Sequence, residues 1–347
     1  MSAVTEVSTL EVPATATAEA PPATLPLPGP LGGRVVTARL AGVAVLAALL
    51  LVLPDALSWA GPAYAIDFGL IIALAVLSIS VLGWIGEISL ATLAQMGMGV
   101  VVLNRLQEAG IPFAVIVPIV IVASIPVSLV LGVFALRLRG VYFAIATLAF
   151  AFLAQKTVFQ TYLGTEGGFE KPLARPSYLT SDQQVYYLLL VSLLVIAGLC
   201  YLILRSWIGT RLTALRDSET AFAVLGHSPA RYKLFTICFA GAIATLTGTY
   251  YGILQQVVPA NYFSPALSIT YFAYAVVGGL GSIAGAIASG VVFGAVPKYL
   301  ETLSEGRFVG YDQFFAGAVA LVVILTLPGG LTELGRRIWR RVEGVNR

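Results

Sequence analysis

The side chains of this sequence that could do chemistry are few, and many gather in one polar stretch, Arg205 to Lys233, between two apolar runs. His227 is the only histidine, so no histidine metal cluster can form, and a catalytic triad would have to use this loop residue. Cys200 and Cys238 both lie inside apolar runs, without metal-site spacing, which is typical of core residues. The chain also has no G-x-x-x-x-G-K-[ST] phosphate loop. These features argue against a catalytic site, a metal site or a nucleotide cofactor bound by this chain.

The polar stretch, RSWIGTRLTALRDSETAFAVLGHSPARYK, predicts one short amphipathic helix over residues 217–226. Asp217 can accept backbone N–H bonds as the N-cap, and Glu219 places a carboxylate in the first turn, where the helix dipole favours it. Gly226 provides a C-terminal stop. The apolar face comprises Ala221, Phe222 and Leu225. A free helix this short is not stable in water, so this face requires a partner, either its own bundle or another protein.

The composition indicates a membrane protein. Of the 347 residues, 58% are hydrophobic and 11% are charged, whereas soluble domains carry about 25% charged residues. The net charge of +3 is small and gives no sign of nucleic-acid binding. Residues 1–33 are rich in Ala, Thr, Pro and Glu without apolar periodicity, and predict a disordered cytoplasmic tail. Residues 34–335 form the expected membrane domain and residues 336–347 a basic cytoplasmic tail. We therefore expect an all-α polytopic helical bundle.

Ten apolar runs are candidates for the spans of this bundle. They cover residues 40–53, 64–82, 89–104, 112–136, 141–160, 184–204, 234–256, 266–278, 283–299 and 313–328. A straight transmembrane helix needs about 20 residues. The runs at 40–53, 89–104 and 266–278 are shorter and are expected to be tilted, broken or partly re-entrant. The expected number of transmembrane helices is therefore eight to ten.

The lysines and arginines predict the orientation of these spans, because they concentrate in cytoplasmic loops. If both termini are cytoplasmic, fourteen of the twenty basic residues fall on that side. They lie in the segment before the first run, at 137–139, in the 205–233 loop and in the C-terminal tail. An even number of predicted spans separates each group from the next, as a single cytoplasmic face requires. The 205–233 loop is therefore expected to be cytoplasmic.

The sequence around the predicted helix resembles that of a known family. GTRLTALRDSETAFAVLGHSPARYKL is similar to the cytoplasmic loop of the branched-chain amino-acid permease family of ABC importers. The family's first arginine falls on Thr210, with Arg211 one place later, and Phe222 replaces an alanine. In that family the loop carries the helix that docks on the ATPase subunit. The resemblance thus implies a coupling role for Arg211, Arg216, Asp217, Glu219, Ala221, Phe222, Leu225 and Gly226.

Two further motifs of this family provide candidates for the solute pathway. GWIGEISLATLAQMGMG at 83–99 resembles a family segment, with Glu87 in place of the usual glutamine. Glu87 is either an ionisable group near the pathway or a solvated carboxylate that caps the next helix. LRLRGVYFAIATLAFAFLAQ at 136–155 resembles a second family segment. The weaker pathway candidates are Gly86, Glu87, Ser89, Tyr142 and Thr147. For Tyr142 and Thr147 the alternatives are an interfacial aromatic and a threonine bonded to its own helix.

A third motif predicts close helix packing. VVGGLGSIAGAIASGVVFGA at 276–295 resembles a glycine-rich family segment and places small residues every four positions in two rows. Small residues allow helices to approach closely in lipid. The packing candidates are Gly281, Ser282, Gly285, Ala286, Gly290 and Gly294. TEGGFEKP at 165–172, in an expected extracytoplasmic loop, and LPGGL at 327–331 also resemble family segments, so the resemblance covers about residues 64–331.

The resemblance implies a permease subunit of an ATP-driven importer in the bacterial inner membrane, working by alternating access. Its partners would be separate ATPase subunits that use ATP, a second related permease, a periplasmic substrate-binding protein and membrane lipid. The solute would be a branched-chain or related amino acid, or, as an alternative, urea or an amide. A second alternative is an ion-coupled secondary transporter, for which Asp67, Glu87 and Lys156 are the charged candidates. A membrane-embedded enzyme would need a convergent set of acid and base groups, which the sequence does not offer.

Overall fold

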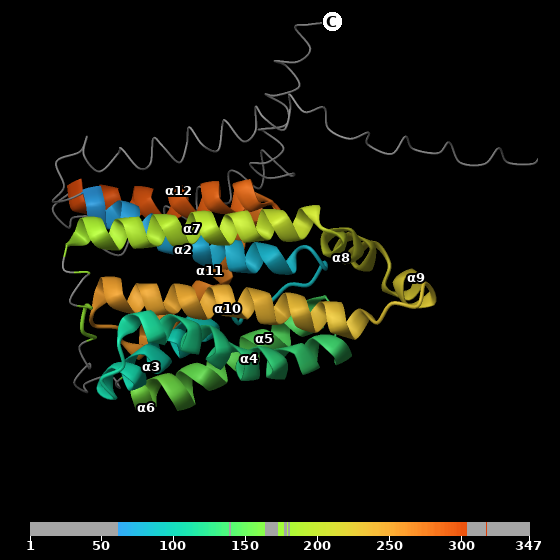
Figure 1. Cartoon of the computed structure of the whole chain (residues 1–347), viewed down its shortest axis with the longest axis horizontal. Coiled ribbons are helices and arrows are strands. Elements are labelled where there is room, and N and C mark those ends of the chain that lie inside the picture. The colour runs from blue at the N-terminus through green and yellow to red at the C-terminus, as the bar shows by residue number, and fades with distance from the viewer. Residues whose placement is uncertain are drawn as a thin grey trace, which may run out of the picture. The chain divides into compact units, whose positions relative to one another are not determined.

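The computed structural model describes residues 62–138, 140–163, 173–176, 179, 181–303 and 317. The predicted runs at 40–53 and 313–328 lie outside the described residues, as do the expected tails 1–33 and 336–347. So do the motifs at 165–172 and 327–331. In the described part, every element is a helix, as expected for an all-α bundle, and no strand occurs there (Figure 1).

Eight of the ten predicted apolar runs lie in the described part, and each forms a helix. The helices are α2 (Pro62–Leu82), α3 (Thr92–Glu108), α4 (Phe113–Arg137), α5 (Val141–Ala154), α7 (Asp182–Arg205), α10 (Pro229–Gln255), α11 (Pro265–Gly278) and α12 (Ile283–Leu303). The helix of α5 continues through a π-helical turn, η1 (Gln155–Phe159), into α6 (Gln160–Tyr162). A 3-10 turn, η2 (Ala260–Phe263), precedes α11.

The lengths of these helices agree with the expectation that some runs are too short to cross a bilayer upright. Within the described residues, six helices are long and apolar enough to cross a membrane, namely α2, α4, the α5–α6 helix, α7, α10 and α12. At 17 and 14 residues, α3 and α11 are shorter. The N-cap of α3 is Ala91, two residues after Ser89. The Ser89 hydroxyl accepts a bond from the Ala91 N–H at 3.2 Å.

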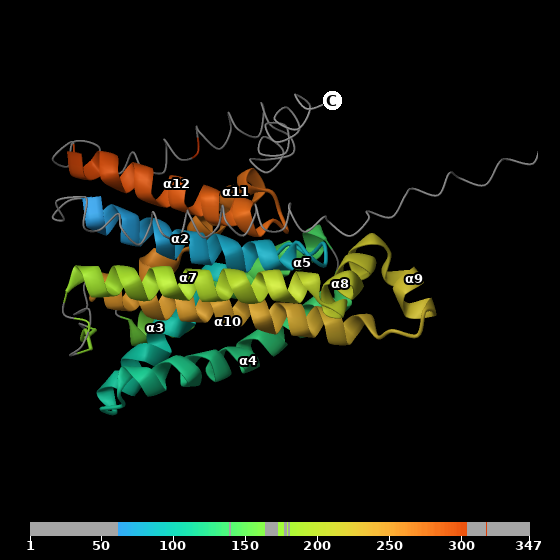
Figure 2. The same ribbon diagram turned by 45° about the horizontal axis from the view of Figure 1, so that its top comes forward.

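The core of the described bundle is built on α2 and α10. In the apolar stretches of these two helices, 89% and 83% of the residues are buried, against 22–33% in the other four spans. α10 packs against α3 and α4 on one side and against α2 on the other, and α2 also contacts α7, α11 and α12 (Figures 1 and 2). The outer helices therefore present large apolar side chains outward, such as Val122 on α4 and Leu202 on α7. Such surfaces suit lipid or a membrane partner.

The small residues of α12 face two different helices. A Cβ added to Gly294 would lie 2.7 Å from the Gly69 Cα, and one added to Gly290 would collide with the backbone of Ala73. Both contacts are with α2, against which α12 packs most extensively. On the other row, a Cβ added to Gly278 of α11 would lie 2.5 Å from the Gly285 carbonyl oxygen. The two predicted rows thus let α12 approach α2 and α11 at backbone distance.

The helices alternate in direction between two ends of the bundle. At one end, the turn after α2 contacts the turn before α12 and the start of α5. At the other end, Tyr64 donates to Gln255, and Gln107 donates to the Ala174 carbonyl. The polar segment 205–233 lies at the first of these ends, with α8 (Trp207–Asp217) and α9 (Glu219–Val224) beyond the end of α7 (Figures 1 and 2).

Candidate functional site

The segment 205–233 contains two short helices rather than one. Ser206 caps α8, since its hydroxyl accepts the Ile208 N–H at 3.2 Å. Ser218 caps α9 by accepting the Ala221 N–H at 3.2 Å. The expectation that Asp217 is the N-cap is wrong, because Asp217 ends α8 and the serine beside it has the extended backbone that a cap requires. Glu219 lies in the first turn of α9, as expected.

The end of α9 is fixed by Gly226. This glycine has φ +81°, a conformation that side chains rarely adopt, and its N–H bonds to the Ala223 carbonyl. The N–H of His227 bonds to the Phe222 carbonyl at 3.4 Å. These two bonds form a Schellman motif, which satisfies carbonyls that would otherwise be left open at the helix end. The predicted C-terminal stop at Gly226 is therefore confirmed.

Phe222 faces its own chain, so the bundle is the partner of this residue of the predicted apolar face. Its side chain is only 2% exposed. The ring meets Tyr232 edge-on at 5.3 Å between centroids and lies 5.1 Å from His227. The bundle itself therefore receives this side of α9. Because Phe222 occupies that side, it anchors the helix rather than offering itself to another protein.

The outward side of α9 still carries apolar residues. Val224 is 87% exposed and Leu225 is 72% exposed, and Ala221 is also exposed. We define Ala221, Val224 and Leu225 as the tip of α9, the helix of this segment that lies farther from α7 in Figure 1. α9 is too short and too polar to be one of the apolar spans, so these exposed aliphatic side chains mark an interaction surface.

A buried ion cluster ties α9 to the membrane helices. Lys233, in the second turn of α10, is 4% exposed, and its Nζ donates to Glu87 Oε1 at 3.0 Å and to Glu219 Oε2 at 3.1 Å. Glu87 is 6% exposed, so it is not a solvated carboxylate, and Glu219 is 26% exposed. One ammonium group thus joins α9, α10 and the turn between α2 and α3. A buried charge is tolerated only with such a partner.

A second contact from the segment reaches the turns of the bundle through Arg216. A Cβ added to Gly86 would lie 3.3 Å from the Arg216 Cγ, and one added to Gly281 would lie 3.7 Å from its Nη1. Both glycines have positive φ, and their turns are joined by a bond from Trp84 Nε1 to the Gly281 carbonyl at 3.1 Å. The end of α8 therefore lies against two glycine turns that join four helices of the bundle.

Residues predicted to line a pathway lie in different environments. Thr147 is fully buried, donates to the Ala144 carbonyl at 2.8 Å and accepts the Leu90 N–H at 2.9 Å, so it is bonded to its own helix and also holds the α2–α3 segment. Tyr142 is 73% exposed on α5 and points away from the core. Gly86, Glu87 and Ser89 lie together in the α2–α3 segment.

Three residues that matter here, Lys233, Ser218 and Val224, carry no role in the expectations from sequence. The acidic partner of Lys233, Glu87, lies 146 positions away in the chain. Ser218 rather than Asp217 caps α9, and Val224 is exposed on that helix. A lysine four residues after a helix-initiating proline, at the start of an apolar run, was the available signal for a buried charge partner. In the described residues, no group of three His, Cys, Asp or Glu side chains could hold a metal ion.

The described residues contain six long apolar helices and one polar helical segment between α7 and α10, which together define a polytopic membrane protein. The family model described as "Branched-chain amino acid transport system / permease component" matches residues 62–324. The chain therefore belongs to this family of transport permeases, as the motifs implied. This family is one of permeases, not of enzymes.

The most similar curated relatives include LivM, the permease protein of the high-affinity branched-chain amino acid transport system, from Salmonella typhimurium and Escherichia coli. Each is 27% identical over 255 residues, which cover 65% of this chain and 59% of the relative. A probable branched-chain amino acid transport permease protein, LivH from Methanocaldococcus jannaschii, is 26% identical over 157 residues, 44% of this chain and 48% of its own. The chain thus spans about three-fifths or less of these relatives. No solved structure matches.

Proposed function

We propose that this chain is the membrane permease subunit of an ATP-driven ABC importer in the bacterial inner membrane, with both termini in the cytoplasm. Its solute is a branched-chain or related amino acid, as the names of its relatives suggest for them. Its partners are separate ATPase subunits, a second related permease and an extracytoplasmic substrate-binding protein. This chain binds no cofactor, and ATP is used by the partners.

The observation that carries the proposal is the double ion pair of Lys233. In an importer of this kind, movement of the ATPases must reach the transmembrane helices through this segment. Lys233 joins Glu219 of α9 to Glu87 in the α2–α3 turn at 3.0–3.1 Å. Lys233 and Glu87 are buried, so a tilt of α9 either moves that turn or breaks the contact with the partly exposed Glu219. The geometry supports transmission from α9 to α2 and α3.

The mechanism follows as alternating access. The ATPases bind the tip of α9, and closure of the ATPase pair displaces α9 as a unit, since its two ends are capped and Phe222 anchors its inner side. The displacement reaches Gly86 and Glu87 through Lys233 and Arg216, where positive-φ glycines permit the α2–α3 turn to change conformation. The solute pathway through the bundle then closes on one side of the membrane and opens on the other.

Reconstitution of the complete transporter in liposomes tests this proposal. Uptake should require ATP supplied on the side of α9 and should continue when an uncoupler and a sodium ionophore remove the proton and sodium gradients. Uptake that persists without ATP and stops with the uncoupler would contradict it.

That second outcome would favour an ion-coupled transporter, a candidate supported by one observation. Asp67 in α2 is 1% exposed, and its Oδ1 has no hydrogen-bond partner among the described residues. An intramembrane carboxylate is a functional candidate by default. Asp67→Asn separates the candidates, since an ATP-driven importer should keep its ATP-dependent uptake with this substitution.

A further inference from the structure

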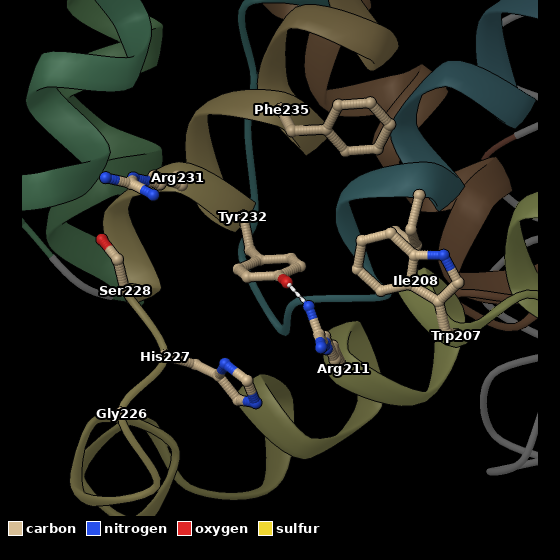
Figure 3. Close-up of a pocket in the computed structure, with 9 residues that line it drawn as sticks. All are labelled: Trp207, Ile208, Arg211, Gly226, His227, Ser228, Arg231, Tyr232 and Phe235. Atoms are coloured by element: carbon tan, nitrogen blue, oxygen red, sulfur yellow. Dashed lines mark hydrogen bonds between the residues drawn. The ribbon is translucent and has the colours of Figure 1, made fainter.

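A cavity of about 480 Å³ lies between α8 and the start of α10, with Tyr232 in its wall (Figure 3). Its walls include Trp207, Arg211, His227, Arg231, Tyr232 and Phe235. Neither the fold nor the ion cluster at Lys233 uses this cavity. Its volume is within the range of about 300–1,000 Å³ typical of small-molecule sites.

The cavity is cationic. Arg211 and Arg231 both line it, and neither forms an ion pair with a carboxylate in the part of the chain that the structure describes. The Arg211 guanidinium lies over the Trp207 ring at 4.3 Å and donates to the Tyr232 hydroxyl. These contacts hold the planar guanidinium in one orientation. An oriented arginine without a carboxylate partner matches phosphate oxygens.

The rim of the cavity belongs to helix faces that suit lipid. Trp207 is 61% exposed and Phe235 is 42% exposed. One or two turns away along α7, Tyr201 and Leu202 are also exposed, on a helix long and apolar enough to span a membrane. Exposed tryptophan beside arginine at the end of an apolar helix is typical of the membrane–water interface. The cavity therefore stands where headgroups would lie, with an apolar surface continuing from it toward the bilayer.

We propose that this cavity binds the phosphate headgroup of an anionic phospholipid. The arginines contact the phosphate, and the acyl chains lie along the exposed faces of α7 and α10. The apolar rim favours a lipid over a free phosphate ion, because an ion gains nothing from exposed Trp207 and Phe235. Basic pockets between membrane helices bind anionic headgroups in this way.

The test measures phosphatidylglycerol binding to the full chain with its co-purifying partners, by native mass spectrometry against phosphatidylcholine. Arg211→Gln and Arg231→Gln should each lower the apparent affinity about five-fold, the factor expected for one basic side chain at an anionic surface. Arg231 is exposed, so its substitution leaves the fold intact. The control is Arg105→Gln, because Arg105 also lies over a ring, that of Tyr162 at 4.6 Å, but at the other end of the bundle.

Three results would overturn the proposal. The first is unchanged phosphatidylglycerol binding in the Arg211→Gln/Arg231→Gln double variant. The second is displacement of the lipid by millimolar inorganic phosphate with no effect of Trp207→Ser, which would indicate a site for the free ion. The third is loss of ATPase co-purification in the arginine variants with unchanged lipid binding, which would assign the cavity to the protein partner.

Discussion

Removal of the Lys233 ammonium group should damage the protein more than removal of either carboxylate. Lys233→Met leaves Glu87, 6% exposed, as a buried charge without a counter-ion, and this loss costs about 3–5 kcal/mol. Glu219 is 26% exposed and can turn to water, so loss of its ion pair with Lys233 costs less than about 1 kcal/mol of stability. The cost of Lys233→Met therefore comes almost entirely from the stranded carboxylate of Glu87.

A second substitution makes this reasoning testable. If the unpaired charge of Glu87 dominates, adding Glu87→Gln to Lys233→Met should restore about 2 kcal/mol of stability. The buried group left unpaired is then neutral, and its burial costs only about 1–3 kcal/mol. Glu87→Gln alone should be mild, since Lys233 keeps Glu219 as its partner. The double variant should thus be more stable than the single Lys233→Met variant, although it carries more changes.

The assay is thermal unfolding of the purified variants in one detergent, read as the fraction that remains monodisperse. Since unfolding of membrane proteins is often irreversible, the order of the variants is the result to compare. The expected order of stability is wild type, then Glu87→Gln, then the double variant, then Lys233→Met. A double variant less stable than Lys233→Met would refute the argument. So would a Lys233→Met variant that unfolds at the same temperature as the wild type.

Three further results are expected. Phe222→Asp should lower the amount of folded protein, because it places a charge in the buried contact with Tyr232 and His227; normal abundance would contradict the inward orientation. Gly290→Leu should reduce expression, since its Cβ meets the α2 backbone, whereas Gly198→Leu, whose Cβ would meet no other described helix within 4 Å, should not. Single cysteines at Val224 and Glu108 should react with an impermeant reagent from opposite sides of the membrane; labelling of both from one side would contradict the alternation of the helices.

Much of the fold could be predicted from the sequence, because apolar length and small-residue spacing are local signals. The apolar run at 283–299 predicted α12, and its two rows of small residues indicated the faces that approach α2 and α11. The glycines in the turn after α2 were equally readable, since Gly86 adopts a positive φ. The apolar run that predicts α10 starts at 234, five residues after the helix begins at Pro229. Proline is common as a first helical residue, but an apolar run does not include the polar first turn that it starts.

The orientation of α9 could not be predicted in the same way. With six residues, this helix has apolar side chains on both sides, and only the packing partner decides which side is buried. Tyr232 and His227 receive Phe222, and they follow it in the chain after the turn at Gly226. The contact between Lys233 and Glu87 depends on helices far apart in the sequence, which one sequence without structure cannot bring together.

The central claim, that α9 couples this permease to an ATPase, is tested most directly at Leu225. Leu225→Asp places a charge on the 72% exposed tip without touching the ion cluster, and Thr213→Asp adds the same charge to an exposed position on α8. Burying a leucine is worth about 1.5–3 kcal/mol, or roughly ten- to hundredfold in affinity. The account predicts that Leu225→Asp keeps normal abundance but loses ATPase co-purification and uptake by about that factor, while Thr213→Asp retains both. Full co-purification and uptake with Leu225→Asp would contradict it.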